Sequence, residues 1–160
     1  AELGLPKSVL AEDNLRQPLK VILDGRNQLK ADLICLQTSS PTLLINSRPN
    51  AAPFLSSVSQ WQAPYEGQQL NLAAVFDYLG SQQINSVWVE AGAKLAGALL
   101  QSKLIDELIL YQAPKLMGNS GQDLFAIEPL TNMQQAYSLT WTDIRQIGPD
   151  LKLTAKIAYE

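Results

Sequence analysis

The sequence contains no histidine and only one cysteine, Cys35. A single thiol cannot close a disulfide within its own chain, and a serine-type triad needs a histidine base. Zinc sites are usually built from cysteine and histidine, so we expect no metal site within this chain. Cys35 itself is predicted to be a small core residue. These absences exclude disulfide frameworks, zinc chemistry and histidine-based catalysis from these residues.

Charge is also scarce, and it forms no basic cluster. Charged residues make up 17% of the chain, and the formal net charge is −3. A nucleic-acid-binding surface would need a basic patch, so we expect no nucleic acid as partner. No apolar run approaches the roughly 20 residues of a membrane helix, and the first residues do not resemble a signal peptide. We therefore predict a cytoplasmic protein that does not bind a membrane.

The residues that are present favour a globular protein. With 160 residues, 46% of them hydrophobic, the chain can bury a core of its own. We expect residues 1–14 to be an N-terminal arm or the end of an expressed fragment, and residues 15–160 to form one domain. Hydrophobic periodicity and turn signals predict strands at 19–24, 41–46, 86–89 and 108–111, helices at 70–79 and 94–102, and a hairpin of 136–145 with 150–159.

Two segments are less clearly defined by their sequences. Residues 31–40 fit either a single helical turn or a brief strand, and a short strand is possible near 58–61. Gly80 is expected to end the first helix, because glycine is common just after a helix.

The stretch from Ser86 to Leu100 is predicted to organise the site. Val87, Trp88 and Val89 favour a buried strand, which places Glu90 at the end of that strand. Ligands of open α/β sheets bind at this position, where a helix start offers N–H groups to an anion. The spacing of the glycines matches neither the dinucleotide fingerprint nor the P-loop. A plain turn between strand and helix is therefore the alternative to an anion site.

A longer pattern is more specific. The segments 82–101, 104–111 and 113–118, extended by 14–24 and 147–150, resemble the C-terminal reductase domain of the bacterial bifunctional riboflavin-biosynthesis deaminase–reductase. The resemblance implies a dihydrofolate-reductase-like α/β fold, with a mixed sheet, helices on both faces and a terminal antiparallel hairpin. It also implies an enzyme, an NADPH-dependent pyrimidine reductase, which reduces 5-amino-6-(5-phosphoribosylamino)uracil to the ribitylamino compound. A homodimer and an upstream zinc deaminase domain are further implications.

The resemblance also implies roles for individual residues. Glu90 matches a substrate-contacting glutamate, whereas by itself it could be a carboxylate that faces water. The cofactor segment, in which helix-start N–H groups hold the NADPH phosphates, corresponds to Gly92, Ala93, Lys94, Leu95, Ala96, Gly97 and Ala98. Lys94 could equally be a solvated helix residue. Gly25 and Asp24 are further cofactor candidates, although the turn signature favours a capping role for Asp24. No residue is assigned a catalytic role.

Two features of the family pattern have no counterpart in the sequence. A strand with the pattern Lys-Leu…Ser-Leu-Asp-Gly-Arg and a following Ser-x-Trp segment, which supply much of the pocket in the family, are missing. We therefore expect the reductase domain to be incomplete at its N-terminus, and this chain alone to bind NADPH weakly without turnover. The alternative function is a non-catalytic nucleotide-binding or assembly fragment. A related NADPH reductase that acts on folate or another pyrimidine is disfavoured by the length of the match.

Overall fold

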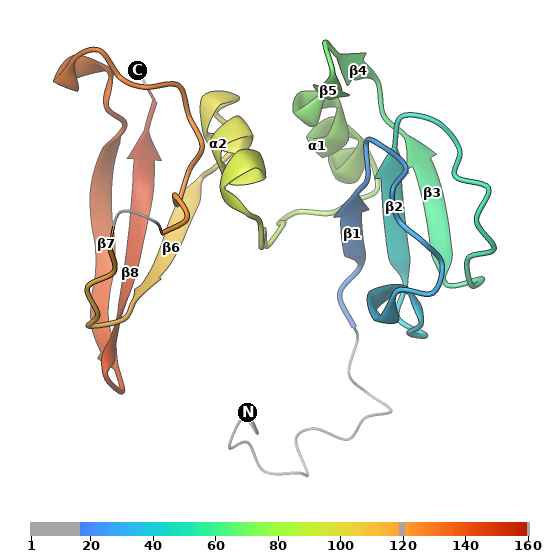
Figure 1. Cartoon of the computed structure of the whole chain (residues 1–160), viewed down its shortest axis with the longest axis horizontal. Coiled ribbons are helices and arrows are strands. Elements are labelled where there is room, and N and C mark those ends of the chain that lie inside the picture. The colour runs from blue at the N-terminus through green and yellow to red at the C-terminus, as the bar shows by residue number, and fades with distance from the viewer. Residues whose placement is uncertain (1–16, 119–120, 160) are drawn as a thin grey trace. The chain divides into compact units, whose positions relative to one another are not determined.

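The computed structural model describes residues 17–118 and 121–159, so the expected arm at residues 1–14 lies outside the described part. Contacts between residues divide the chain into two compact units, Ala1–Gln82 and Gln83–Glu160. Figure 1 shows the elements of each unit. The single domain expected over residues 15–160 is not tested by this division and stays a prediction.

The first unit is built on a three-stranded parallel sheet. Its strands are β1 (Lys20–Leu23), β2 (Thr42–Asn46) and β3 (Val58–Gln62), in the order β1-β2-β3. All five residues of β2 are buried, as expected of an apolar strand between two parallel neighbours. The strands predicted at 19–24 and 41–46 and the possible strand near 58–61 are confirmed.

Short elements complete the edges of this unit. Residues 31–40 contain a single 3-10 turn, η2 (Ile34–Leu36), in which Leu36 is 1% exposed. Cys35 in the same turn is exposed, so its predicted core position is wrong. The tight turn directs Leu36 inward and its neighbour outward. A two-stranded ribbon of β4 (Tyr65–Glu66) and β5 (Gln69–Leu70) was not expected from the sequence.

Helix α1 (Leu72–Ser81) packs against the parallel sheet. Its first turn is capped by Asn71, whose side chain accepts a hydrogen bond from the backbone N–H of Ala74 at 2.8 Å. Tyr78 stacks on Trp61 of β3, with ring centroids 4.0 Å apart. Gly80 lies inside the helix and does not end it, because Ser81 continues the helical hydrogen bonding. The helix was therefore predicted correctly and its end was not.

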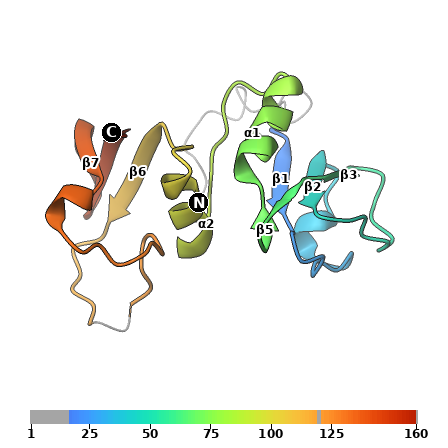
Figure 2. The same cartoon turned by 90° about the horizontal axis from the view of Figure 1, so that it is seen from above.

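The second unit is an antiparallel sheet with one helix beside it. It contains α2 (Ala93–Gln101), β6 (Glu107–Gln112), η3 (Met133–Gln135), β7 (Ser138–Ile147) and β8 (Asp150–Ala158). The strand order is β6-β8-β7, with β8 in the middle. Figure 2, like Figure 1, shows α2 beside β6. Gly148, with φ 58°, starts the two-residue turn between β7 and β8, which confirms the predicted terminal hairpin.

The buried strand predicted at 86–89 is not present. Residues 83–92 form no helix or strand, and Val87, Trp88 and Val89 are 38%, 68% and 45% exposed. Trp88 is therefore not a core residue, and Glu90 does not end a strand. A strand needs a neighbour that pairs with its backbone groups. The sheets of the described residues consist of other segments, and this run pairs with none of them.

The predicted α/β class is confirmed by the parallel sheet, the helices and the antiparallel hairpin. Within residues 17–118 and 121–159, no helix has the length and apolar character that crossing a membrane requires.

Tyr159 generates a prediction on stability and pH. Its hydroxyl donates to the carbonyl of Ile105 at 2.9 Å and accepts from the N–H of Ile105 at 3.3 Å. Burial raises the pKa of the Tyr159 hydroxyl above its usual 10.0, although the bond to Ile105 opposes the shift. We expect Tyr159→Phe to lower the free energy of unfolding by about 1 kcal/mol at neutral pH. Since a raised pKa stabilises the protonated folded form, this difference should shrink as the pH rises above 10.

Urea unfolding of the wild type and Tyr159→Phe at several pH values measures this difference. If the difference in free energy of unfolding between the two proteins stays constant through pH 10 and above, ionisation of Tyr159 does not cause a loss of stability at alkaline pH.

Candidate functional site

The start of α2 offers backbone donors that no side chain caps. Gly92 occupies the N-cap position in extended backbone (φ −78°, ψ 169°) and has no side chain with which to cap the helix. The first hydrogen bond into the helix runs from the N–H of Ala96 to the carbonyl of Gly92, at 3.1 Å. The N–H groups of the preceding first turn therefore point out of the helix start. Ala91, Gly92 and Lys94 are exposed, so an anion can approach this end.

Glu90 lies two residues before this helix cap. Its carboxylate accepts a hydrogen bond from the indole Nε1 of Trp88 at 3.2 Å, and both residues are exposed. This hydrogen bond keeps the carboxylate of Glu90 beside the indole ring of Trp88. The sequence predicts a binding role for Glu90 but none for Trp88, because a tryptophan between two valines is typical of a buried strand.

Gly97 has a different environment from Gly92. A Cβ placed on Gly97 would come within 2.2 Å of the carbonyl oxygen of Ala126, whereas a Cβ on Gly92 would meet nothing within 4 Å. The N–H of Ala126 also donates to the carbonyl of Ala93 at 2.9 Å. The segment around Ala126 therefore lies directly on α2. Gly97 permits this close backbone approach, while the helix start remains open.

This arrangement separates two kinds of residue within the predicted cofactor segment. The helix start, from Gly92 to Leu95, supplies the outward N–H groups, whereas Gly97 is buried under Ala126. A glycine inside a helix is itself a sequence signal of a close approach. The partner at Ala126 has no such signal, so only the structure identifies it.

The two remaining candidates, Asp24 and Gly25, lie together at the carboxyl end of β1 in the first unit. The carboxylate of Asp24 accepts hydrogen bonds from the N–H groups of Gln28 at 2.8 Å and Leu29 at 2.9 Å. It is 7% exposed. Both carboxylate oxygens of Asp24 are thus used within the turn, which favours the capping role over contact with a cofactor.

Gly25 is enclosed by neighbours of its own unit. Its carbonyl accepts hydrogen bonds from the hydroxyls of Ser47, at 3.0 Å, and Tyr65. A Cβ at this position would come within 3.1 Å of Leu70 and of the Tyr65 hydroxyl. The absence of a side chain at position 25 therefore has a packing reason, independent of any ligand.

The described residues form an α/β protein in which helix α2 begins with exposed N–H donors, an arrangement that suits an anion. Comparison with known proteins gives the family. The family model described as "RibD C-terminal domain" matches residues 4–153. The chain therefore belongs to the RibD C-terminal domain family. That family is the one that the sequence resembled.

Individual relatives agree with this assignment. The chain is 35% identical to the riboflavin biosynthesis protein RibD of Escherichia coli, and the match covers 92% of this chain and 40% of that relative. It is 31% identical to a 5-amino-6-(5-phosphoribosylamino)uracil reductase of Buchnera aphidicola, over 91% of this chain and 70% of that one. The chain thus spans about 40% of the length of the E. coli relative, and more of the shorter reductase.

A solved structure supports the fold. RibD of Acinetobacter baumannii superposes with a TM-score of 0.77 at 27% identity, covering 99% of this chain and 41% of that one. The expected dihydrofolate-reductase-like fold of RibD reductase domains is thereby confirmed.

The contact between Gly97 and Ala126 generates a prediction. Gly97→Ala should lower the free energy of unfolding by about 1–3 kcal/mol, because the new methyl group clashes with the Ala126 backbone. Helix propensity alone would give the opposite sign, since alanine is favoured over glycine in a helix.

Gly80→Ala in α1 is the matched control, since a Cβ there meets nothing within 4 Å. That variant should be neutral or more stable by up to about 1 kcal/mol. Chemical denaturation of both variants measures the contrast. Equal effects at the two positions would show that Ala126 does not restrict Gly97.

Proposed function

We propose that this chain acts in the NADPH-dependent reduction of 5-amino-6-(5-phosphoribosylamino)uracil to the ribitylamino compound, a step of riboflavin biosynthesis. The observation that carries the proposal is the start of α2, which no side chain caps, with Glu90 two residues before the N-cap residue Gly92. Membership of the family and the name of the Buchnera relative supply the substrate. The same family is the basis for expecting a homodimer, and for expecting a zinc deaminase domain in the native protein.

The residues present at the helix start fit the phosphates of a nicotinamide cofactor. The first-turn N–H groups carry the positive end of the helix dipole, and Gly92 leaves room for a phosphate to approach them. Lys94, exposed in the first turn, can add a positive charge there. When bound, the cofactor supplies the hydride for the reduction of the sugar imine.

Glu90 is proposed to hold the substrate. Its carboxylate can accept hydrogen bonds from the amino and hydroxyl groups of a ribosylaminouracil, and the bond from Trp88 Nε1 occupies only one of its oxygens. Hydride transfer requires that donor and acceptor carbons be held close together. A carboxylate that fixes the substrate beside the helix start contributes to that positioning.

Oxidation of NADPH by the purified chain, with and without the ribosylaminouracil, tests the reaction. Substrate-dependent oxidation supports the reductase. Binding of NADPH without turnover is the result expected above for this chain alone, and it favours the second candidate for the isolated chain, a non-catalytic nucleotide-binding or assembly fragment.

Gly92→Val tests the phosphate site. The extended backbone at Gly92 suits any residue, and a Cβ there has free space, so the variant should fold. Its branched side chain should obstruct the first-turn N–H groups and abolish the rise in melting temperature that NADPH gives the wild type. Gly92→Ala, which adds only a methyl group, should keep part of that rise. Full protection of Gly92→Val by NADPH would place the cofactor elsewhere.

Glu90→Gln tests the contact with substrate. Losing a hydrogen bond to a charged group costs about 1–3 kcal/mol, so the substrate should protect the variant much less against heat, whereas protection by NADPH should be nearly unchanged. Glu128→Gln, which changes an exposed carboxylate in the same unit, is the control. Equal losses for both ligands would refute the separate roles of Glu90 and the helix start.

A further inference from the structure

Trp88 is the most exposed of the three tryptophans in this chain. It is 68% exposed, whereas Trp141 is 47% exposed and Trp61 is half-buried and stacked on Tyr78 of α1. Single exposed apolar side chains are common on protein surfaces, so exposure alone does not mark a site. Trp88 differs from an ordinary surface residue because its polar end is bonded to a carboxylate.

The indole of Trp88 is bonded through its edge to Glu90. Its Nε1–H donates to one carboxylate oxygen of Glu90 at 3.2 Å. The N–H bond of an indole lies in the plane of the ring, so this hydrogen bond uses the edge of the ring and neither of its faces. It also uses only one of the two oxygens of Glu90. An aromatic face and a carboxylate oxygen therefore lie side by side on one short segment.

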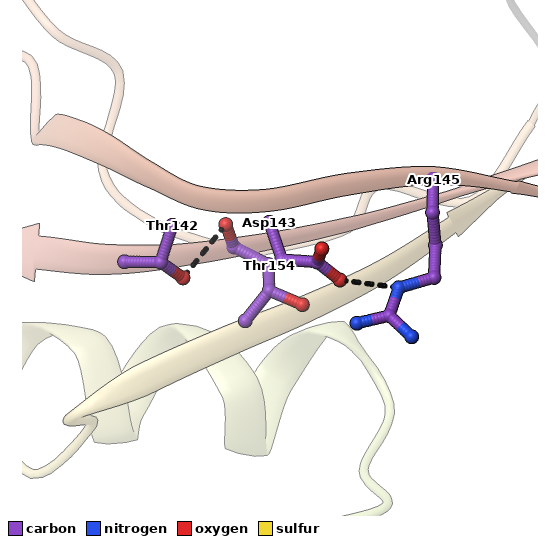
Figure 3. Close-up of polar contacts among 4 residues, drawn as sticks. All are labelled: Thr142, Asp143, Arg145 and Thr154. Carbon is purple, nitrogen blue, oxygen red and sulfur yellow. Dashed lines mark hydrogen bonds and ion pairs between the residues drawn. The ribbon is translucent and has the colours of Figure 1, made fainter.

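The same spacing of tryptophan and acid occurs a second time, with a different arrangement. Trp141 of β7 also stands two residues before an acid, Asp143. There the carboxylate lies 2.7 Å from Nε of Arg145, and Figure 3 shows these two side chains turned toward each other. A shift in strand register also separates Trp141 from Asp143. The spacing alone therefore does not produce the bonded pair that Trp88 forms with Glu90.

We propose that Trp88 binds the substrate, with the uracil ring of the ribosylaminouracil stacked on its indole while Glu90 accepts a hydrogen bond from the same ring. This inference rests on the proposed function and names the part of the substrate that the segment recognises. A pyrimidine offers a flat face for stacking and N–H donors at its edge, which match the indole face and the carboxylate. The bond from Nε1 to Glu90 restricts the indole before the ligand arrives, which lowers the entropy cost of binding.

The test replaces the ring and its N–H group separately. Titration calorimetry of the full chain with the ribosylaminouracil measures the dissociation constant. Trp88→Leu removes the aromatic face and should raise that constant about fivefold or more. Trp88→Phe loses the N–H donor but keeps an aromatic face, so it should retain most of the affinity. Because Trp88 is 68% exposed, folding should tolerate both changes, which the melting temperatures without ligand will check.

Trp141→Leu is the matched control. It removes an exposed tryptophan of the same unit whose neighbouring acid is paired with Arg145, and it should leave the dissociation constant unchanged. Heat protection by NADPH should be the same in Trp88→Leu and the wild type, because the start of α2 is not altered. Loss of protection by NADPH instead would assign the ring to the cofactor and overturn the proposal.

Fluorescence quenching reports contact with the ring itself. Acrylamide is suitable because it is neutral and the charge of Glu90 does not repel it. The ribosylaminouracil should lower the quenching of the wild type by shielding Trp88. In Trp88→Leu, which keeps Trp61 and Trp141, it should cause no such decrease.

Three results would overturn the stacking of the substrate on Trp88: wild-type affinity in Trp88→Leu, an equal loss in Trp88→Phe, or an equal loss in Trp141→Leu. Failure of the proposed function gives a different pattern. If the wild type does not bind the ribosylaminouracil, the function and this inference fail together. If the wild type and all three variants bind it alike, only the inference fails.

Discussion

The close approach of the Ala126 backbone to Gly97 is the constraint on which the second unit's candidate site depends. It fixes the middle of α2, since the 2.2 Å separation from a Cβ position leaves no room for a side chain. The bond from Ala126 to the carbonyl of Ala93 holds the first turn at the same time. Both contacts leave the helix start itself uncovered. The segment can therefore be rigid where it packs and open where a ligand would bind, which preorganises a site.

The carboxylates of Asp24 and Glu90 have different hydrogen-bonding environments, although the sequence predicts that each of them follows a strand. Asp24 follows a strand, is buried and uses both carboxylate oxygens within its turn. Glu90 is exposed and accepts one bond from Trp88. A carboxylate with both oxygens occupied by its own backbone has little capacity left for a ligand. The difference in hydrogen bonding, rather than residue type, makes Glu90 the stronger candidate for a functional contact.

Two segments of this chain have strand character and unpaired backbone groups. β8 is satisfied on both sides by β6 and β7, whereas β7 has one open edge. The exposed run from Val87 to Val89 also has strong strand propensity and no partner among the described residues. Unpaired backbone N–H and C=O groups allow such segments to form hydrogen bonds with another strand.

The sequence by itself determined the elements whose periodicity is strong: the apolar strand β2, the amphipathic helices and the alternating terminal hairpin. It also indicated the family, because the pattern over residues 82–101, 104–111 and 113–118, extended by 14–24 and 147–150, is long and specific. It could not decide whether residues 87–89 form a strand, because strand propensity is not sufficient and the backbone must also pair with a neighbouring strand. The burial of Gly97 under Ala126 was likewise decided only by tertiary structure, whereas turn capping by Asp24 was already favoured by the sequence. The pairing of residues 87–89 and the contact of Gly97 with Ala126 both depend on atoms distant along the chain, so neither leaves a periodic trace in the sequence.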